Sequence, residues 1–272
     1  MRKTDKEFTG SIPEFYDTYL VPLIFTACAE DLAKRVAARA PAFVLEIAAG
    51  SGVVPRVLAP MLPAETRYVV TDLNPAMLDH AKQRQSKPND LEWQQADALD
   101  LPFEDDCFDV VHCQHGAMFF PDRVAGYLQV QRVLKPGGYF VFNVWDQIRD
   151  NEFANLVTEV AAEFFAQDPP RFLARTPHGY HDTAQIRSDL RAAGFSSVEI
   201  ETCTDVSRAP SPRHPAIAYC QGTPLRAEIV SRDAGLLDQI TDRAAQVIAD
   251  RFGDGPVQGK IQFHVITATA AV

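Results

Sequence analysis

Short apolar runs rich in β-branched and aromatic residues alternate with longer helical patterns between about residues 43 and 145. Such alternation is typical of βαβ units, in which parallel strands form a sheet and helices cover its faces. The sequence therefore predicts an α/β fold. Ligands in such folds bind beyond the carboxyl ends of the strands, so a site is expected in the loops that follow them. The predicted strands are Phe43–Ile47, Arg67–Thr71, Leu91–Gln95, Phe108–Cys113 and Tyr139–Trp145.

Two further strands and several helices are predicted outside this region. The segment Ile12–Arg39 has the pattern of one or two amphipathic helices, with Pro13 and Pro22 expected to mark helix starts or breaks. Late strands are predicted at Val198–Asp205 and Lys260–Ala268. Further helices are predicted at Glu152–Gln167, Thr183–Ala193, Pro215–Gln221 and Asp233–Phe252.

The length of 272 residues fits one large domain with added elements. We expect a single domain over residues 1–272. Within it we expect an N-terminal helical cap at 1–40, a ligand-binding core at 41–146 and a cap insertion at 206–259 that folds over the crevice.

Charge and cysteine content restrict the partners and the compartment. Subtracting 36 Asp and Glu from 26 Lys and Arg gives a net charge of −10, so no nucleic-acid partner is expected. The five cysteines are scattered without a CxxC pair, and no early apolar stretch is long enough to span a bilayer. We therefore expect a cytoplasmic chain without a membrane span, and its sequence leaves a homodimer open. His178 and His181 lack a third ligand at a recognisable spacing, so no metal is expected.

The most informative loop follows the first predicted strand. Val44–Val54 reads as a strand, a loop of small residues and the start of a helix, so a ligand could approach the backbone closely and meet unpaired N–H groups. Dinucleotide-binding proteins use similar loops, but Pro55 replaces the third glycine of their GxGxxG pattern. Glu46 at the strand end would repel a pyrophosphate and attract an ammonium group. The loop therefore suits the cationic head group of an amino acid better than a diphosphate.

Two carboxylates follow the next two predicted strands. Asp72 ends the second strand, twenty residues beyond Gly52, where an acid can accept hydrogen bonds from both hydroxyls of a ribose. Asp97 follows the third strand and could accept a hydrogen bond from an adenine amino group, while the backbone N–H of Ala98 donates to the ring. Together with the glycine loop, these residues predict a site for an adenosine that carries an amino-acid tail.

These motifs, in this order, resemble those of the class I S-adenosylmethionine-dependent methyltransferases, in particular the small-molecule branch of the UbiE and methyltransferase type 11 kind. VLEIAAGSG is similar to the family's motif I, VVTDLNPAML to its acidic loop, QADALDLPFEDDCFDVVHCQHG to the adenine loop and fourth strand, and RVLKPGGYFVFNVW to the turn and fifth strand. The resemblance covers about residues 40–146. It implies a Rossmann-like class I methyltransferase fold, with a seven-stranded, mostly parallel sheet whose last strand is antiparallel, and S-adenosyl-L-methionine as the methyl donor.

The resemblance also implies roles for individual residues. Tyr19, in a tyrosine-bearing N-terminal segment, would close over the donor's carboxylate. Ala48 stands where many relatives have glycine, which restricts the loop backbone. The residues implied to bind the donor are Glu46, Ala48, Gly50 and Gly52 at the methionine part, Asp72 at the ribose, Leu73 and Met77 against the adenosine, Asp97 and Ala98 at the adenine edge, and Gln114 at the methionine end.

The expected function is methyl transfer to an oxygen, carbon or nitrogen nucleophile of a small-molecule acceptor. His115 is the candidate catalytic base, because imidazole titrates near neutrality; a polar residue in the pocket wall is the alternative interpretation. Two other functions stay open: a noncatalytic S-adenosylmethionine-binding regulatory protein, and an NAD-dependent dehydrogenase, which Glu46 and Pro55 disfavour. An acidic acceptor could pair with one of Arg171, Arg175, Arg208 and Arg213.

Overall fold

The computed structural model describes residues 15–85 and 91–272. The chain forms two compact units, each assembled from three stretches of sequence. The first, here the core unit, comprises Ala27–Val144, His181–Cys203 and His264–Val272. The second, here the helical unit, comprises the described residues up to Thr26 together with Trp145–Tyr180 and Thr204–Phe263. Residues 1–14 of the predicted N-terminal cap, including Pro13, lie outside the described residues.

Seven strands form one sheet in the order β3-β2-β1-β4-β5-β7-β6. Strands β1 to β5 pair in parallel registers. Strand β7 runs antiparallel to β5, because Ala270 donates its amide to Gly138 while Asp146 donates its amide to Gln262. This confirms the predicted seven-stranded, mostly parallel sheet with an antiparallel last strand. The strands are β1 (Phe43–Glu46), β2 (Arg67–Asp72), β3 (Glu92–Gln95), β4 (Phe108–Gln114), β5 (Leu134–Trp145), β6 (Ser197–Ala209) and β7 (Val257–Thr269).

The late strands are longer than the sequence predicts. Strand β5 begins at Leu134 instead of Tyr139, and β6 continues to Ala209 instead of Asp205. In β5 the extra residues include Pro136 and Gly137, whose local preferences disfavour a strand. A neighbouring strand can supply hydrogen bonds that local preference does not, so tertiary pairing sets these ends.

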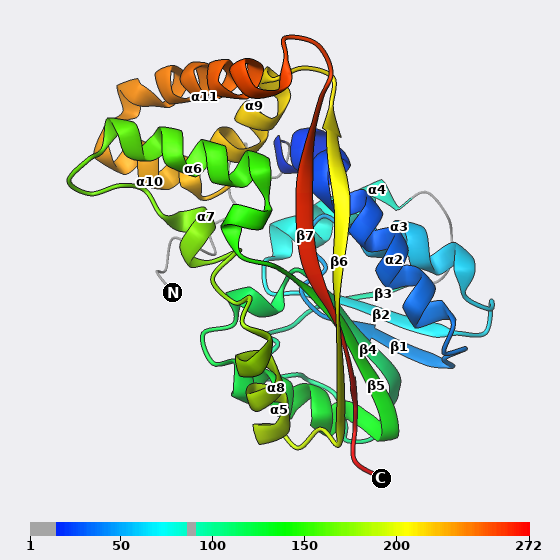
Figure 1. Cartoon of the computed structure of the whole chain (residues 1–272). Helices are drawn as coiled ribbons and strands as arrows, with labels where there is room; N and C mark the ends of the chain where they lie inside the picture. Colours follow the sequence, from blue (N-terminus) through cyan, green and yellow to red (C-terminus); the bar gives the residue numbers. More distant parts are fainter. Residues whose placement is uncertain (1–14, 86–90) are drawn as a thin grey trace. The chain divides into compact units, whose positions relative to one another are not determined.

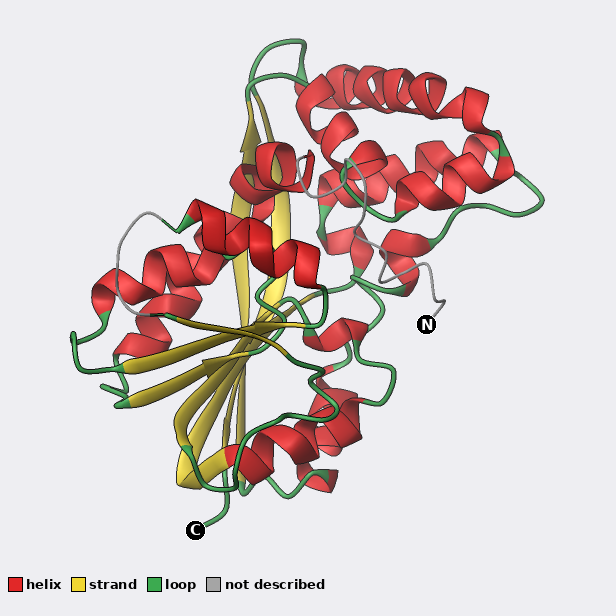
Figure 2. Cartoon of the chain, turned by 180° about the vertical axis from the view of Figure 1, so that it is seen from behind, coloured by secondary structure: helices red, strands yellow, loops and turns green. Residues whose placement is uncertain are grey.

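Helices cover both faces of the sheet in the core unit: α2, α3 and α4 lie on one face and α5 and α8 on the other (Figures 1 and 2). Two starts are fixed by side chains, since Asn74 accepts the amide of Ala76 at 3.0 Å in α4 and Asp122 accepts that of Ala125 at 2.9 Å in α5. These caps set the chain's direction just after the strands. The helices are α2 (Thr26–Ala37), α3 (Val53–Leu58), η3 (Ala59–Met61), α4 (Pro75–Arg84), η4 (Ala117–Phe119), α5 (Arg123–Val133) and α8 (Thr183–Ala192).

In the helical unit, α9 and α11 pack together and α6 lies against both (Figure 1). The apolar face of α11 follows a four-residue spacing through Ile240, Ala244 and Ile248, all buried. Helix α10 was not predicted. Pro22 was expected to mark a helix start or break, but it lies inside the π-helix η2, which continues past it. The helices are η2 (Tyr16–Phe25), η5 (Ile148–Asp150), α6 (Glu152–Phe164), α7 (Phe172–Arg175), α9 (Arg213–Gln221), α10 (Leu225–Arg232), η6 (Ala234–Leu236) and α11 (Leu237–Phe252).

Candidate functional site

The glycine loop joins β1 to α3 and is held against β2. Thr71 donates its hydroxyl to the carbonyl of Glu46 at 2.8 Å, and Ala49 donates its amide to the carbonyl of Thr71 at 2.9 Å. Gly52 has φ +75°, and a Cβ placed on it would lie 2.8 Å from the Cβ of Ala81 in α4. Only glycine satisfies both the backbone angle and this close approach. The loop is therefore fixed in place by its small residues.

Ala48 and Gly50 also have positive φ angles, of 56° and 57°. For Ala48 this left-handed conformation costs roughly 1–2 kcal/mol, because its Cβ crowds the following carbonyl. The predicted restriction at Ala48 therefore takes the form of backbone strain. Beside Gly50 there is space, since a Cβ there would have Met77 Cε, at 3.8 Å, as its nearest neighbour. The loop exposes its backbone on that side to an approaching group.

Asp72 links the glycine loop to the loop that follows β2. Its Oδ2 accepts the amide of Gly50 at 2.8 Å, and its Oδ1 accepts the amide of Asn74 at 2.7 Å. Burial raises the pKa of this carboxyl group, and the two backbone hydrogen bonds oppose that shift. Each carboxylate oxygen offers about two acceptor positions, so each keeps one for a further donor such as a ribose hydroxyl.

Glu46 is the other buried acid of the site. Its side chain is 1% exposed, and burial raises its pKa to about 8 although Tyr68 donates a hydrogen bond to Oε2. The nearby charge of Asp72 raises this pKa further, and Arg56 lowers it. The second oxygen, Oε1, is buried and has no hydrogen-bond partner among the described residues. A buried acceptor without a donor is costly, so Glu46 suits a cationic donor group that would complete it.

The remaining core-unit residues predicted for the donor lie in the loops after β2 and β3, at the start of α4 and at the end of β4. Met77 is buried, whereas the side chain of Leu73 is 43% exposed. Asp97 is exposed and accepts the amide of Leu99 at 3.0 Å, which shapes the loop that carries Ala98. Gln114 is half-buried at the end of β4. Their roles toward a donor stay predictions.

His115 directly follows β4 and has a φ of 47°. Its amide donates to the side-chain Oδ1 of Asn143 at 2.9 Å and to the carbonyl of the same residue at 3.2 Å, which fixes the turn. The next residue, Gly116, packs against the glycine loop so closely that a Cβ on it would lie 2.6 Å from Ala48 Cβ. The turn that carries His115 therefore touches the loop that carries Ala48, which keeps His115 a candidate for chemistry beside the donor.

Tyr19 belongs to the helical unit. Its ring stacks on Phe15 at 5.7 Å and meets His214 at 4.9 Å, and its carbonyl pairs with His214 Nε2 at 3.1 Å. These contacts fix Tyr19 within η2 of that unit. Its proposed action on the donor's carboxylate stays a prediction.

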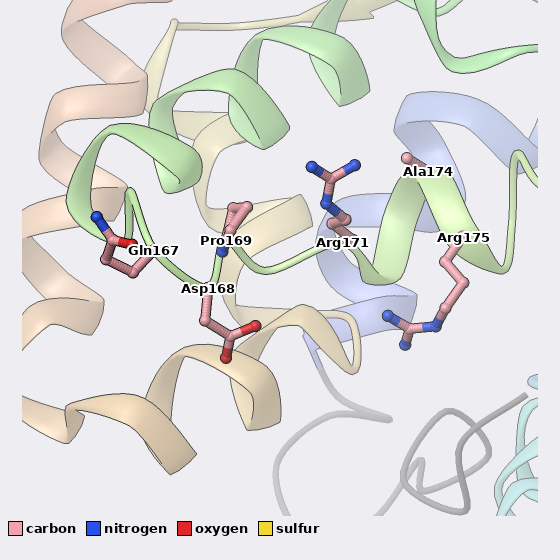
Figure 3. Close-up of a pocket in the computed structure, with 6 residues that line it drawn as sticks. All are labelled: Gln167, Asp168, Pro169, Arg171, Ala174 and Arg175. Atoms are coloured by element: carbon pink, nitrogen blue, oxygen red, sulfur yellow. The ribbon is translucent and has the colours of Figure 1, made fainter.

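A pocket of about 520 Å³ lies in the helical unit (Figure 3). The buried Glu228 organises one wall: its Oε1 pairs with Arg175 at 2.9 Å, and its Oε2 accepts the amides of Arg171 and Phe172. Arg175 is thus held by a carboxylate of its own chain and is a poor partner for an acidic acceptor. The pocket is lined by Gln167, Asp168, Pro169, Arg171, Ala174 and Arg175.

Sequence reasoning missed three polar residues of the site: Tyr68, His112 and Asn143. All three lie inside apolar strand runs, where a polar residue is a signal in itself, because a buried polar group needs a partner. What the sequence does not show is the register. Glu46 is the direct partner of His112, and Tyr68 pairs with Val44, so alternation places the side chains of Glu46, Tyr68 and His112 on one face of the sheet.

Residues 45–142 match the family model described as a methyltransferase domain. The chain is 31% identical over 173 residues to a demethylmenaquinone methyltransferase of Clavibacter sepedonicus, covering 59% of this chain and 68% of that protein. It is 30% identical over 175 residues to a ubiquinone/menaquinone biosynthesis C-methyltransferase UbiE of Idiomarina loihiensis, covering 59% and 69%. A Bacillus halodurans C-125 protein described as a methyltransferase shares the fold, with a TM-score of 0.59 at 19% identity over 89% of this chain and 99% of that one.

The strand order of the sheet, and the glycine loop held by Asp72, are those of a Rossmann-like nucleotide-binding fold. The family model adds that the protein is an enzyme of the methyltransferase class. The chain belongs to the class I S-adenosylmethionine-dependent methyltransferases, in their UbiE-like branch. Its methyl donor is S-adenosylmethionine. The residues present fit that donor: the unsatisfied Glu46 Oε1 suits an ammonium group, and the space beside Gly50 admits close approach to the backbone.

No helix in residues 15–85 and 91–272 is both long enough and apolar enough to cross a bilayer. Within the same ranges, no three His, Cys, Asp or Glu side chains gather as ligands for a metal ion.

Proposed function

We propose that this chain methylates a small-molecule acceptor, and that the acceptor is an electron-rich ring carbon of the hydroquinone type. The observation that carries the acceptor class is the pair of relatives, at 31% and 30% identity, whose names specify demethylmenaquinone and a C-methyltransferase of ubiquinone and menaquinone biosynthesis. Those matches cover 59% of this chain, so the rest of its length is where acceptor specificity can differ.

We assign the donor-binding roles to residues of the core unit. Glu46 would pair with the donor's ammonium group, Asp72 would accept hydrogen bonds from the ribose hydroxyls, and Asp97 with Ala98 would read the adenine edge. When bound, S-adenosylmethionine supplies a methyl group on a sulfonium, which is a good leaving group. The protein's own task is then to hold the acceptor in line and to exclude water. Of the predicted set, Asp72 has the clearest position, since it also ties Gly50 to Asn74.

His115 would take a proton from the acceptor. A hydroquinone hydroxyl must lose its proton for the ring carbon to become a strong nucleophile, and imidazole has the pKa range for that transfer. The side chain is buried on a turn that packs against the glycine loop, which supports a place beside the donor.

The test offers the purified chain S-adenosylmethionine with three acceptors: a 1,4-naphthohydroquinone with an unsubstituted ring carbon, a simple phenol and a primary amine. We expect methylation of the ring carbon, detected by mass spectrometry and located by NMR. Methylation of the phenol or the amine alone would overturn the acceptor class. If none were methylated while the demethylated product of the donor still bound, the noncatalytic regulatory function would be favoured.

Two variants separate the donor site from the base in the same assay. Asp72→Ala should abolish the thermal stabilisation by S-adenosylhomocysteine, which at a hundred times its Kd is worth about 2.7 kcal/mol. Asp100→Ala, at an exposed loop carboxylate, is its control. His115→Asn keeps a residue type that tolerates positive φ and should lower kcat by roughly a hundredfold or more without loss of that stabilisation. Unchanged turnover in His115→Asn would exclude the base role.

A further inference from the structure

Three buried polar side chains form a row across the neighbouring strands β2, β1 and β4, and Glu46 on β1 is the middle one. Tyr68 of β2 donates its hydroxyl hydrogen to Glu46 Oε2, and its oxygen lies 3.0 Å from Nε2 of His112 on β4. Tyr68 is 2% exposed, Glu46 1% and His112 0%. Three polar groups on neighbouring strands, sealed from water, are expensive unless they are arranged to satisfy one another.

With Glu46 ionised, as it must be to pair with an ammonium group, counting protons gives the direction of these bonds. The hydroxyl of Tyr68 has one hydrogen, and it is given to Glu46. The contact between Tyr68 and His112 therefore has to be made by an N–H on Nε2 that donates to the tyrosine oxygen. Burial lowers the pKa of His112 to about 3, so the ring is neutral. Its contact with the tyrosine oxygen then assigns the single ring hydrogen to Nε2. The chain of donation runs from His112 through Tyr68 to Glu46.

The two carboxylate oxygens of Glu46 therefore differ in their hydrogen bonding. Oε2 is occupied by Tyr68, while Oε1 has no hydrogen-bond partner within the described part of the chain. A carboxyl group free to rotate would offer either oxygen and would lose conformational entropy on binding a ligand. One anchored at Oε2 presents Oε1 already oriented, which reduces the cost of binding.

We propose that Tyr68 and His112 are positioning residues that hold the Glu46 carboxyl group so that Oε1 receives the ammonium group of the methyl donor. The inference rests on the proposed role of Glu46 and adds two residues that would not touch the donor. They would act on the amino-acid part of the ligand alone, since neither lies in the loops assigned to the adenosine.

Because only the amino-acid part of the ligand should be affected, the test compares a ligand that has this part with one that lacks it. S-adenosylhomocysteine carries the amino-acid part, whereas 5′-methylthioadenosine has the same adenosine and a thioether but no amino acid. Kd values for both ligands would be measured by titration calorimetry on the full chain. Tyr68→Phe should weaken S-adenosylhomocysteine about tenfold, the loss expected for a hydrogen bond to a charged group, and change 5′-methylthioadenosine by less than twofold. A purely structural role would weaken both ligands alike.

Two more variants sharpen the result. His112→Gln keeps an N–H donor close to the place of Nε2 and should preserve the ligand preference, whereas His112→Leu removes the donor and should lower it. Tyr127→Phe is the matched control: this tyrosine is fully buried in the same unit, packed on Phe140 and Phe142, and its variant should leave both Kd values unchanged. Should Tyr68→Phe fail to fold, the contrast between the two His112 variants decides the question.

The outcomes separate this inference from the proposal beneath it. Glu46→Gln should reduce the preference for S-adenosylhomocysteine over 5′-methylthioadenosine. If it does, but Tyr68→Phe and His112→Leu do not, the positioning role is overturned while the donor site stands. If Glu46→Gln leaves the preference unchanged, the proposed role of Glu46 fails, and the positioning role fails with it.

Discussion

Strain at a single residue is a measurable property of the glycine loop. Ala48 has a φ of 56°, which costs an alanine roughly 1–2 kcal/mol, while glycine costs roughly 0.5–1 kcal/mol through the entropy of the unfolded chain. Ala48→Gly should therefore stabilise the protein by about 0.5–1 kcal/mol, a rise of about 2 °C in Tm. Differential scanning calorimetry measures this directly.

The matched control lies one residue further on. Ala49 has no positive φ, so Ala49→Gly brings only the entropic cost and should destabilise by about 0.5–1 kcal/mol. Equal effects of the two substitutions, in either direction, would show that backbone strain at Ala48 contributes nothing measurable.

The raised pKa of Glu46 predicts a pH dependence of stability with a definite sign. The folded chain binds this proton more tightly, with a pKa of about 8 against 4.5 for the ordinary group. The resulting stabilisation is full below about pH 4.5 and is lost as the pH rises through about 8. Glu46→Gln removes this loss, so its free energy of unfolding in urea should fall less than that of the wild type between about pH 5 and about pH 9.

Other groups near Glu46 do not produce the same pH dependence of the free energy of unfolding. Asp72 and Arg56 are the charged neighbours that influence its pKa, and both are kept in Glu46→Gln. Burial raises the pKa of Cys113 to about 12, so its thiol does not titrate in this range. Glu104→Gln, at an exposed carboxylate, should reproduce the wild-type pH profile. A Glu46→Gln profile parallel to that of the wild type would contradict the raised pKa.

At the scale of elements, the burial of the apolar face of α11 predicts which substitutions in this helix destabilise the protein. Ile248 is fully buried where α11 packs on α6 and α9, so Ile248→Ala leaves a cavity and should cost about 2–4 kcal/mol. Gln246→Ala, on the exposed face of the same helix, should stay within about 0.5 kcal/mol. Urea unfolding monitored by circular dichroism compares the two.

The same helix variant tests where donor binding resides. Every proposed donor-binding residue except Tyr19 belongs to the core unit. At a temperature where Ile248→Ala is fully folded, its Kd for S-adenosylhomocysteine should stay within about twofold of the wild-type value. A larger loss would place part of the donor site in the helical unit.

Elements with a strong local signal were predictable, and those set by pairing were not. Short apolar runs bounded by turn residues predicted all seven strands, because strand composition and turn residues are properties of short segments. Helix α10, at Leu225–Arg232, was missed because eight residues give too short a pattern. The start of β5 was missed because its first residues depend on partners distant in sequence.

The candidate site divides in the same way. Asp72 and the glycine loop form a motif that can be read along the chain, and the hydrogen bond from Gly50 to Asp72 joins its two parts. Tyr68 and His112 were not found, because their relation to Glu46 exists only once three strands are in register. Local sequence predicts which residues end a strand, but not which buried side chains face each other across the sheet.

At the scale of the whole molecule, the chain passes between its two units five times, at the boundaries that follow Thr26, Val144, Tyr180, Cys203 and Phe263. Neither unit is a continuous stretch of sequence. No single residue range therefore contains the whole of one unit without including residues of the other. Comparisons limited to residues 45–142 accordingly describe the donor-binding part of the core unit and leave the helical unit uncharacterised.

The strand order also has a consequence for synthesis on the ribosome. Strand β6 has a single neighbour in the sheet, β7, and β7 lies between β6 and β5 (Figure 1). Until Val257–Thr269 leaves the ribosome, β6 has no strand to pair with. More than forty residues, which form α9, α10, η6 and α11, are made in between. During that interval β6 presents open edges to any other chain nearby. The growing polypeptide should therefore need protection from aggregation longest at β6, until the last strand emerges and inserts beside β5.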